Sequence, residues 1–189
     1  MASERPHDEA ELIAKAKKGT DAFAELYQRH VNRIYNYVYH RVGSHHEAED
    51  LTARTFQRAL EHIARYEDRG APISAWLYRI AHNLVANWHR DRSRRQKKVF
   101  SLNDYVLANP AEEGPAKRGE ASEEQGALME AIRRLPADRQ LLLVLKYSEE
   151  LPNAKIGAIM GRSEGAIKSL YHRTLIALRK DLESRGFRR

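Results

Sequence analysis

Residues 152–179 read PNAKIGAIMGRSEGAIKSLYHRTLIALR, and this stretch decides the fold. Pro152 is well placed to begin a short helix, and Ser163 is a good cap for a longer helix that follows. Gly161 supplies the turn between them, and Gly157 supplies the small side chain where two crossing helices approach closely. Two helices with this turn and this crossing residue are typical of a helix-turn-helix.

The longer helix of this motif has two faces of different chemistry. Rotating about 100° per residue from Ile167 places Leu170, Tyr171, Thr174 and Leu178 on the inward side. The opposite side carries Gly165, Lys168, Ser169, His172 and Arg173. Cations, a hydroxyl and an imidazole suit the edges of bases in a major groove. An ordinary helical hairpin with a solvated face is the alternative, but the turn, crossing glycine and apolar anchors together favour DNA binding.

The remainder of the chain also has helical periodicity. Apolar residues recur at three-and-four spacing between Phe23 and Val42, and Ser44 with Glu47 forms a capping box for the next helix. No segment alternates with a period of two. We therefore expect further helices at about 9–18, 23–42, 45–66 and from Ser74 onward.

A change of composition divides the chain in two. Residues 98–121 are rich in Pro, Gly, Glu and Lys and hold few large apolar side chains, so they read as a flexible linker. Helical patterning returns at Ser122, capped through Gln125, and Pro136 begins another helix. The expected fold is all-α, with two small helical domains, 1–97 and 122–189, of which the second contains the helix-turn-helix.

Charge and composition exclude several classes of protein. Lys plus Arg is 33 against 26 for Asp plus Glu, so the net charge is +7, and a chain this basic expects a polyanion such as nucleic acid. The absence of cysteine removes disulfides, thiolate catalysis and cysteine-based metal sites. The N-terminus has no apolar core of a signal peptide, and the longest aliphatic run, Leu141–Leu145, is too short for a membrane span. These features favour a cytoplasmic protein.

The helix that follows Ser74 carries a second polar stripe opposite its apolar side. The stripe consists of Trp76, Arg79, Asn83, Asn87 and Arg90. Aromatic rings stack on unpaired bases, amides hydrogen-bond base edges, and Arg neutralises phosphates. The helix then runs into a basic cluster between Arg90 and Lys98, which is either a phosphate-binding surface or a solvated helix end.

Several of these segments resemble one known family. Residues 47–52 (EAEDLT), with Phe56, resemble the core-binding helix of sigma region 2, and residues 76–83 (WLYRIAHN) resemble the promoter-melting helix that follows it. Residues 135–139 and 163–169 resemble sigma region 4. Their order, with a linker and no domain between them, resembles an extracytoplasmic-function (ECF) RNA polymerase sigma factor over about 20–97 and 122–183. The resemblance implies promoter-specific transcription initiation.

The resemblance also implies roles for matching positions. The surface that docks on the β′ clamp of core RNA polymerase, together with its support, would include Asp50, Leu51, Thr52 and Phe56. The loop from Asp68 to Ile73, with Arg69 and Gly70, would cup a flipped base of the −10 element, and Asn83 would lie beside it. The rest of the surface that binds and melts this element would be Trp76, Arg79, Asn87 and Arg90. The −35 element would be read by Arg162, Ser163, Lys168, Ser169, His172 and Arg173. Further implied partners are the β flap and an anti-sigma factor, and the free protein would be a monomer that binds no membrane.

Other functions have less support in the sequence. A stand-alone helix-turn-helix regulator would not need the stripe around Asn83. A metal-dependent hydrolase could use His45, His46 and Glu49, but these lie at a helix start without a third ligand at fixed spacing, and the aromatic signatures of common RNA-binding modules are absent. We therefore expect no catalytic residue, no metal and no cofactor. Within the resemblance, Ala53 and Arg54 depart from the usual Gln-Glu of the family.

Overall fold

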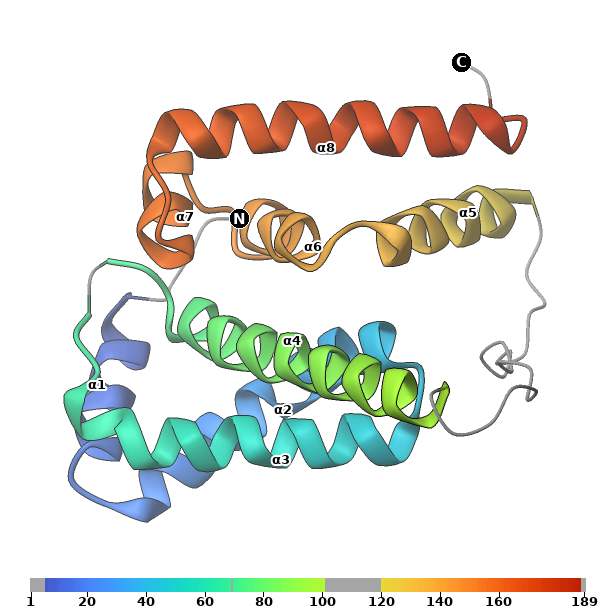
Figure 1. Ribbon diagram of the computed structural model, residues 1–189. Coiled ribbons are helices and arrows are strands. Elements are labelled where there is room, and N and C mark those ends of the chain that lie inside the picture. Colours follow the sequence, from blue (N-terminus) through green and yellow to red (C-terminus); the bar gives the residue numbers. More distant parts are fainter. Residues whose placement is uncertain (1–5, 69, 101–119, 188–189) are drawn as a thin grey trace. The chain divides into compact units, whose positions relative to one another are not determined.

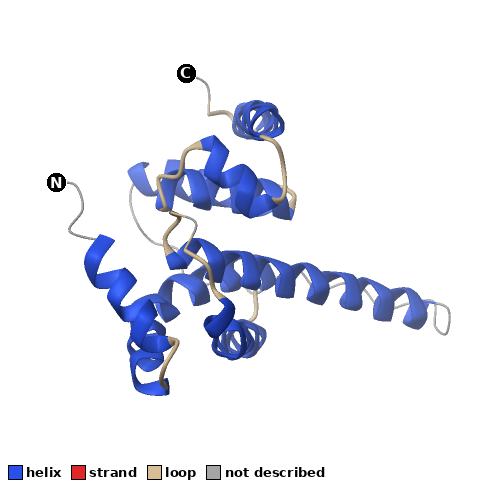
Figure 2. Cartoon of the chain, turned by 90° about the vertical axis from the view of Figure 1, so that its left-hand side faces the viewer, coloured by secondary structure: helices blue, strands red, loops and turns tan. Residues whose placement is uncertain are grey.

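The structure is a computed structural model that describes residues 6–68, 70–100 and 120–187. These residues form helices joined by short turns, and none of them forms a β-strand (Figure 2). The chain divides into two compact units, Met1–Trp88 and His89–Arg189. The all-α fold expected from the sequence is confirmed.

The first unit is built around two long helices and the start of a third (Figure 1). Its elements are α1 (Pro6–Ala16), α2 (Thr20–Val42), α3 (His45–His62), the 3₁₀ turn η1 (Ile63–Arg65) and the first half of α4 (Ile73–Phe100). Helix α2 packs against both α1 and α3, and α1 also touches η1. The side chains that fill the core include Leu26, Ile34, Val38, Leu51, Phe56, Leu77, Leu84 and Val85, all of them buried.

The predicted turn between α2 and α3 forms, but its capping box is only half complete. Gly43 adopts a left-handed conformation (φ 69°) that ends α2, and the Ser44 hydroxyl accepts a hydrogen bond from the Glu47 N–H at 3.4 Å. The Glu47 carboxylate does not return to the cap. Instead it accepts a hydrogen bond from the Trp88 indole N–H of α4, at 2.7 Å.

The second unit places one long helix against three shorter ones (Figure 1). Its elements after the end of α4 are α5 (Glu120–Arg134), α6 (Ala137–Leu143), the π-helical turn η2 (Val144–Ser148), α7 (Asn153–Met160) and α8 (Glu164–Ser184). Ile156 of α7 is fully buried, and so is Ile167 of α8, which marks the inward side predicted from the sequence. A neighbouring apolar cluster joins α5, α6 and α8 through Ala131, Leu135, Leu143 and Leu178.

The helix-turn-helix has the local geometry expected from its sequence. A Cβ added at Gly157 would lie 2.5 Å from the Arg162 carbonyl oxygen, so the crossing accepts only glycine without a shift. Gly161 ends α7 in the left-handed region, with φ 67°. The Ser163 hydroxyl caps α8 by accepting from the Ala166 N–H at 3.2 Å. These three predictions are confirmed.

Element boundaries differ from the sequence prediction in three places. Helix α3 ends at His62 and continues as the 3₁₀ turn, four residues short of Tyr66. Helix α5 begins at Glu120, so Ser122 lies inside the helix and is not its cap. Helix α4 reaches Phe100, beyond the predicted start of the linker at 98; the rest of the predicted linker, residues 101–119, lies outside the described residues. Among the described helices, none combines the length and apolarity that a membrane crossing requires.

Candidate functional site

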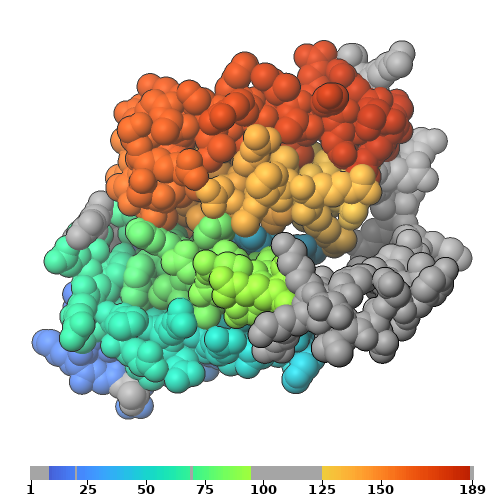
Figure 3. All heavy atoms as spheres, in the orientation of Figure 1, coloured from blue at the N-terminus to red at the C-terminus, as the bar shows by residue number. Residues whose placement is uncertain are grey.

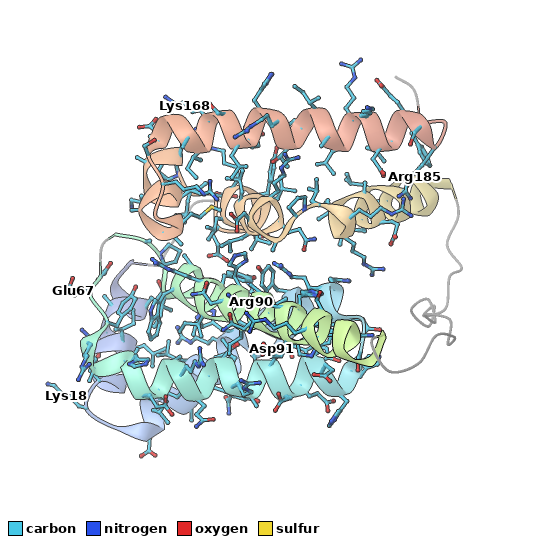
Figure 4. The ribbon with its side chains drawn as sticks, viewed as in Figure 1. Lys18, Glu67, Arg90, Asp91, Lys168 and Arg185 are labelled. Carbon is cyan, nitrogen blue, oxygen red and sulfur yellow. The ribbon has the colours of Figure 1, made fainter. Side chains whose placement is uncertain are left out.

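Helix α4 presents the polar stripe predicted from its sequence. Arg79, Asn83 and Arg90 are exposed, while Trp76 and Asn87 are half-buried. Arg90 lies beyond the middle of the helix, next to Asp91 (Figure 4). The opposite side of α4 enters the core of the first unit, which fixes the rotation of the helix and therefore the direction of the stripe.

The loop before α4 is tied to the stripe through aromatic packing. The Trp76 ring lies 5.0 Å from the Tyr66 ring, between centroids, at an interplanar angle of 53°. Asp68 and Gly70 are exposed, and the Asp68 carboxylate accepts a hydrogen bond from the Gly70 N–H at 2.8 Å. Gly70 has φ 70°. This short turn directs the described residues of the loop toward solvent.

One residue assigned to −10 binding is buried, and another lies outside the described part of the chain. Ile73 is only 1% exposed, so its side chain anchors the start of α4 in the core and cannot face a base. Its part in −10 binding stays a prediction, and its burial suits it to support the loop instead of touching a base. Arg69 lies outside the described residues.

A cluster beside Asn83 was missed by the sequence analysis. The Arg41 guanidinium, at the end of α2, donates to the Tyr37 hydroxyl at 2.6 Å and lies 3.4 Å from the His82 Nδ1. The Tyr37 hydroxyl is itself 3.3 Å from the same nitrogen. The cluster brings a cation from α2 to His82, the residue before Asn83 on α4, across 41 residues of sequence, and no local pattern could have shown it.

The predicted polymerase-binding residues of α3 divide into one exposed side chain and three buried ones. Asp50 is exposed and forms an ion pair with Arg54 one turn later, at 3.4 Å. Leu51, Thr52 and Phe56 are buried in the first unit, at 1%, 4% and 4% exposure. Of the surface and support that the resemblance implies, Asp50 can therefore supply the exposed surface, and the three buried side chains can supply its support; the docking role itself stays a prediction.

The outward face of α8 is exposed as predicted. Gly165, Lys168, Ser169, His172 and Arg173 are all exposed, and Lys168 lies at the beginning of the helix (Figure 4). The space-filling view shows α7 and α8, orange to red, at the surface of the second unit (Figure 3).

Two cations of this region already have acidic partners in their own chain. Lys168 pairs with Glu164 at 2.9 Å, and Arg162 pairs with Asp138 of α6. The Arg173 Nε donates to the Ser169 carbonyl at 3.2 Å, which draws its guanidinium along the helix. These contacts pre-position the cations of the face and lower its net positive charge.

The histidines at the start of α3 do not form a metal site in the structure. The His45 Nδ1 lies 2.6 Å from the Tyr35 hydroxyl, and its ring stacks on Tyr39 at 4.4 Å between centroids. In the described part of the chain, no group of three or more His, Asp or Glu side chains is arranged to hold a metal ion.

Comparisons with known proteins identify the family. The Sigma-70 region 2 family matches residues 26–95, and the Sigma-70 region 4 family matches residues 125–178. The ECF RNA polymerase sigma factor SigW of Bacillus subtilis is 34% identical over 90% of this chain and 94% of its own length. The chain belongs to the ECF family of RNA polymerase sigma factors. It therefore serves promoter-specific initiation of transcription, with core RNA polymerase and promoter DNA as its partners.

Further comparisons agree with the ECF assignment. The ECF sigma factor BldN of Streptomyces coelicolor is 38% identical over 89% of the chain, which spans 63% of that relative's length. A solved structure of the sigma factor RpoE with the anti-sigma factor NepR from Bartonella quintana has a TM-score of 0.65 and 24% identity. The match covers 85% of this chain and 96% of the other. This likeness shows the fold.

Proposed function

We propose that this ECF factor divides promoter recognition between the α4 stripe and the outward face of α8. The observation that carries the proposal is a difference in chemistry between two exposed helix faces in two separate units. The α4 stripe combines an indole, two amides and guanidinium groups, which suits unpaired bases of the −10 element. The α8 face combines cations, a hydroxyl and an imidazole, which suits the duplex of the −35 element.

The polymerase-docking role falls to the exposed face of α3 around Asp50. This face lies on a different helix from the DNA-binding stripe, so both can be engaged together. In this proposal the chain contributes no catalytic group, because bond formation belongs to the polymerase, and it acts in the cytoplasm with the polymerase and the chromosome. The β flap contact and an anti-sigma partner follow from the family resemblance and stay predictions.

The proposal is tested with two sets of variants in reconstituted holoenzyme. Asn83→Ala should weaken binding to a premelted −10 template and lower open-complex formation, because it removes an amide from the base-binding stripe. Binding to an isolated −35 duplex should not change. The double variant Lys168→Ala, Arg173→Ala should weaken binding to the −35 duplex and leave binding to the premelted −10 template unchanged. The slope of log affinity against log salt concentration for duplex binding should fall by roughly one unit per lost phosphate contact.

Matched controls are available in the same two units. Asn36→Ala removes an exposed amide from α2, and Arg179→Ala with Lys180→Ala removes two exposed cations from the C-terminal half of α8. Both controls should behave as the parent in permanganate reactivity of promoter thymines and in binding to each promoter fragment. If Asn83→Ala binds the premelted template as tightly as the parent does, the base-binding role of the α4 stripe is wrong.

A further inference from the structure

Tyr66 joins both ends of the loop that precedes α4. Its backbone N–H closes the 3₁₀ turn by donating to the Ile63 carbonyl at 3.0 Å. Its hydroxyl donates to the Ala71 carbonyl at 3.3 Å, five residues further along the chain. The exposed residues Glu67, Asp68 and Gly70 lie between these two bonds, and Glu67 marks the start of the loop in Figure 4.

The Tyr66 ring is held on two sides. Its centroid lies 5.0 Å from that of Trp76, the first aromatic of the α4 stripe. The Lys17 ammonium, just after α1, lies 6.0 Å from the same ring. Tyr66 is 9% exposed. One side chain therefore connects α1, the loop and the start of the base-binding stripe.

The phenol is suited to act as a permanent donor. Burial and the charges of Asp68 and Glu9 raise the pKa of Tyr66 to about 12. The hydroxyl therefore stays protonated over the whole physiological range, and its bond to the Ala71 carbonyl persists with it.

We propose that Tyr66 is a positioning residue for base capture: its hydroxyl and ring fix the described residues of the loop, 67–68 and 70–72, relative to Trp76 and Asn83. The inference rests on the proposed role of the α4 stripe and adds a residue that acts through the loop. A flipped base needs its pocket in place before it arrives, because ordering a loop during binding costs free energy that the base contacts would have to offset. Without the hydroxyl the ring still packs, but the two ends of the loop are no longer joined.

The test is Tyr66→Phe in holoenzyme, with a DNA library that carries a randomised unpaired −10 segment below a fixed −35 duplex. The parent should enrich one base strongly at the captured position. Tyr66→Phe should lower that enrichment roughly threefold to tenfold, the loss expected for one hydrogen bond, while the other positions and helical content stay as in the parent. The matched control is Tyr35→Phe on α2, which removes a hydroxyl that is hydrogen-bonded to His45. It should leave the base preference unchanged.

Asn83→Ala in the same selection distinguishes the positioning role of Tyr66 from the base-binding role of the α4 stripe. If Asn83→Ala flattens the preference and Tyr66→Phe does not, the positioning role is wrong and the stripe assignment stands. If neither variant changes the profile, both are wrong. An equal loss at every position, or weaker binding to an isolated −35 duplex, would mean that Tyr66→Phe acts on general stability, and this too would overturn the inference.

Discussion

At the scale of single residues, the two units depend on a few buried polar and small groups. His30 is 9% exposed in α2, and its Nδ1 has no hydrogen-bond partner among the described residues. Burial, and then the charges of Arg33 and Arg29, lower the pKa of His30 from 6.5 to about 4. The folded protein therefore keeps this imidazole neutral at a pH where the unfolded chain would protonate it.

This shift predicts a loss of stability in mild acid. Between pH 6.5 and pH 4 the unfolded state binds the extra proton, so the free energy of unfolding falls as the pH falls through this window. From pH 7 to pH 5 the loss should reach about 2 kcal/mol, measured by urea unfolding of the first unit. In His30→Leu this part of the pH dependence should disappear. An equal loss in parent and variant would assign the acid sensitivity to other groups.

A second residue-scale prediction concerns the crossing of α7 and α8. Gly157→Ala places a methyl group 2.5 Å from the Arg162 carbonyl oxygen, so the turn between α7 and α8 must shift. The second unit should lose roughly 1–3 kcal/mol of unfolding free energy and bind a −35 duplex more weakly. The matched control is Gly126→Ala in α5, where an added Cβ meets nothing within 4 Å. That variant should be neutral or more stable by up to about 1 kcal/mol. Similar effects of the two substitutions would contradict the close approach at Gly157.

At the scale of elements, the bond between Trp88 and Glu47 joins the DNA-binding helix to the start of the polymerase-docking helix. The indole N–H of α4 donates to the carboxylate of α3 at 2.7 Å. Because the carboxylate is half-buried, removing its donor leaves a poorly solvated charge. The relative placement of α3 and α4 therefore depends on this pair.

Trp88→Phe should lower the unfolding free energy of the first unit by about 1–2 kcal/mol, since the ring still packs but donates no hydrogen bond. Glu47→Ala should cost a similar amount, and the double variant should cost less than the sum, with a coupling of about 1 kcal/mol. Glu49→Ala, which removes an exposed carboxylate from the same turn of α3, is the control. Strict additivity would show that the two side chains act independently.

The sequence predicts the elements well because their signals are local. Helix caps, turn glycines and apolar spacing lie within a few residues of one another, so Ser44, Gly157 and Ser163 could be assigned without a structure. The outward direction of Asn83 and of the α8 face follows from helical rotation alone.

Contacts between distant segments could not be predicted in this way. The pairs Trp88 with Glu47, and Arg41 with His82, join positions 41 residues apart. The burial of Leu51 and Ile73 depends on which helices cover them. Periodicity gives the face of a helix, but the neighbour that covers that face is a property of the fold, so the sequence alone could not separate supporting residues from exposed ones.

At the scale of the whole molecule, docking on the polymerase should depend on the exposed carboxylate of Asp50. Asp50→Arg reverses the charge on a face that the fold leaves exposed, so helical content should not change. Core polymerase should bind roughly tenfold more weakly or worse, because a misplaced interfacial charge costs several kcal/mol. Glu25→Arg is a close control, since Glu25 also pairs with an Arg four residues later, on α2. Unchanged affinity in Asp50→Arg would place the docking surface elsewhere.

The carboxylates that accompany Lys168 and Arg162 have a consequence for how the protein searches a chromosome. A phosphate competes with Glu164 or Asp138 for these cations, so random duplex attracts this face less than unpaired cations would. A free molecule consequently spends less time trapped on irrelevant DNA. At a promoter, hydrogen bonds to the base edges offset the loss of these ion pairs. The two carboxylates therefore raise the ratio of promoter affinity to non-specific affinity.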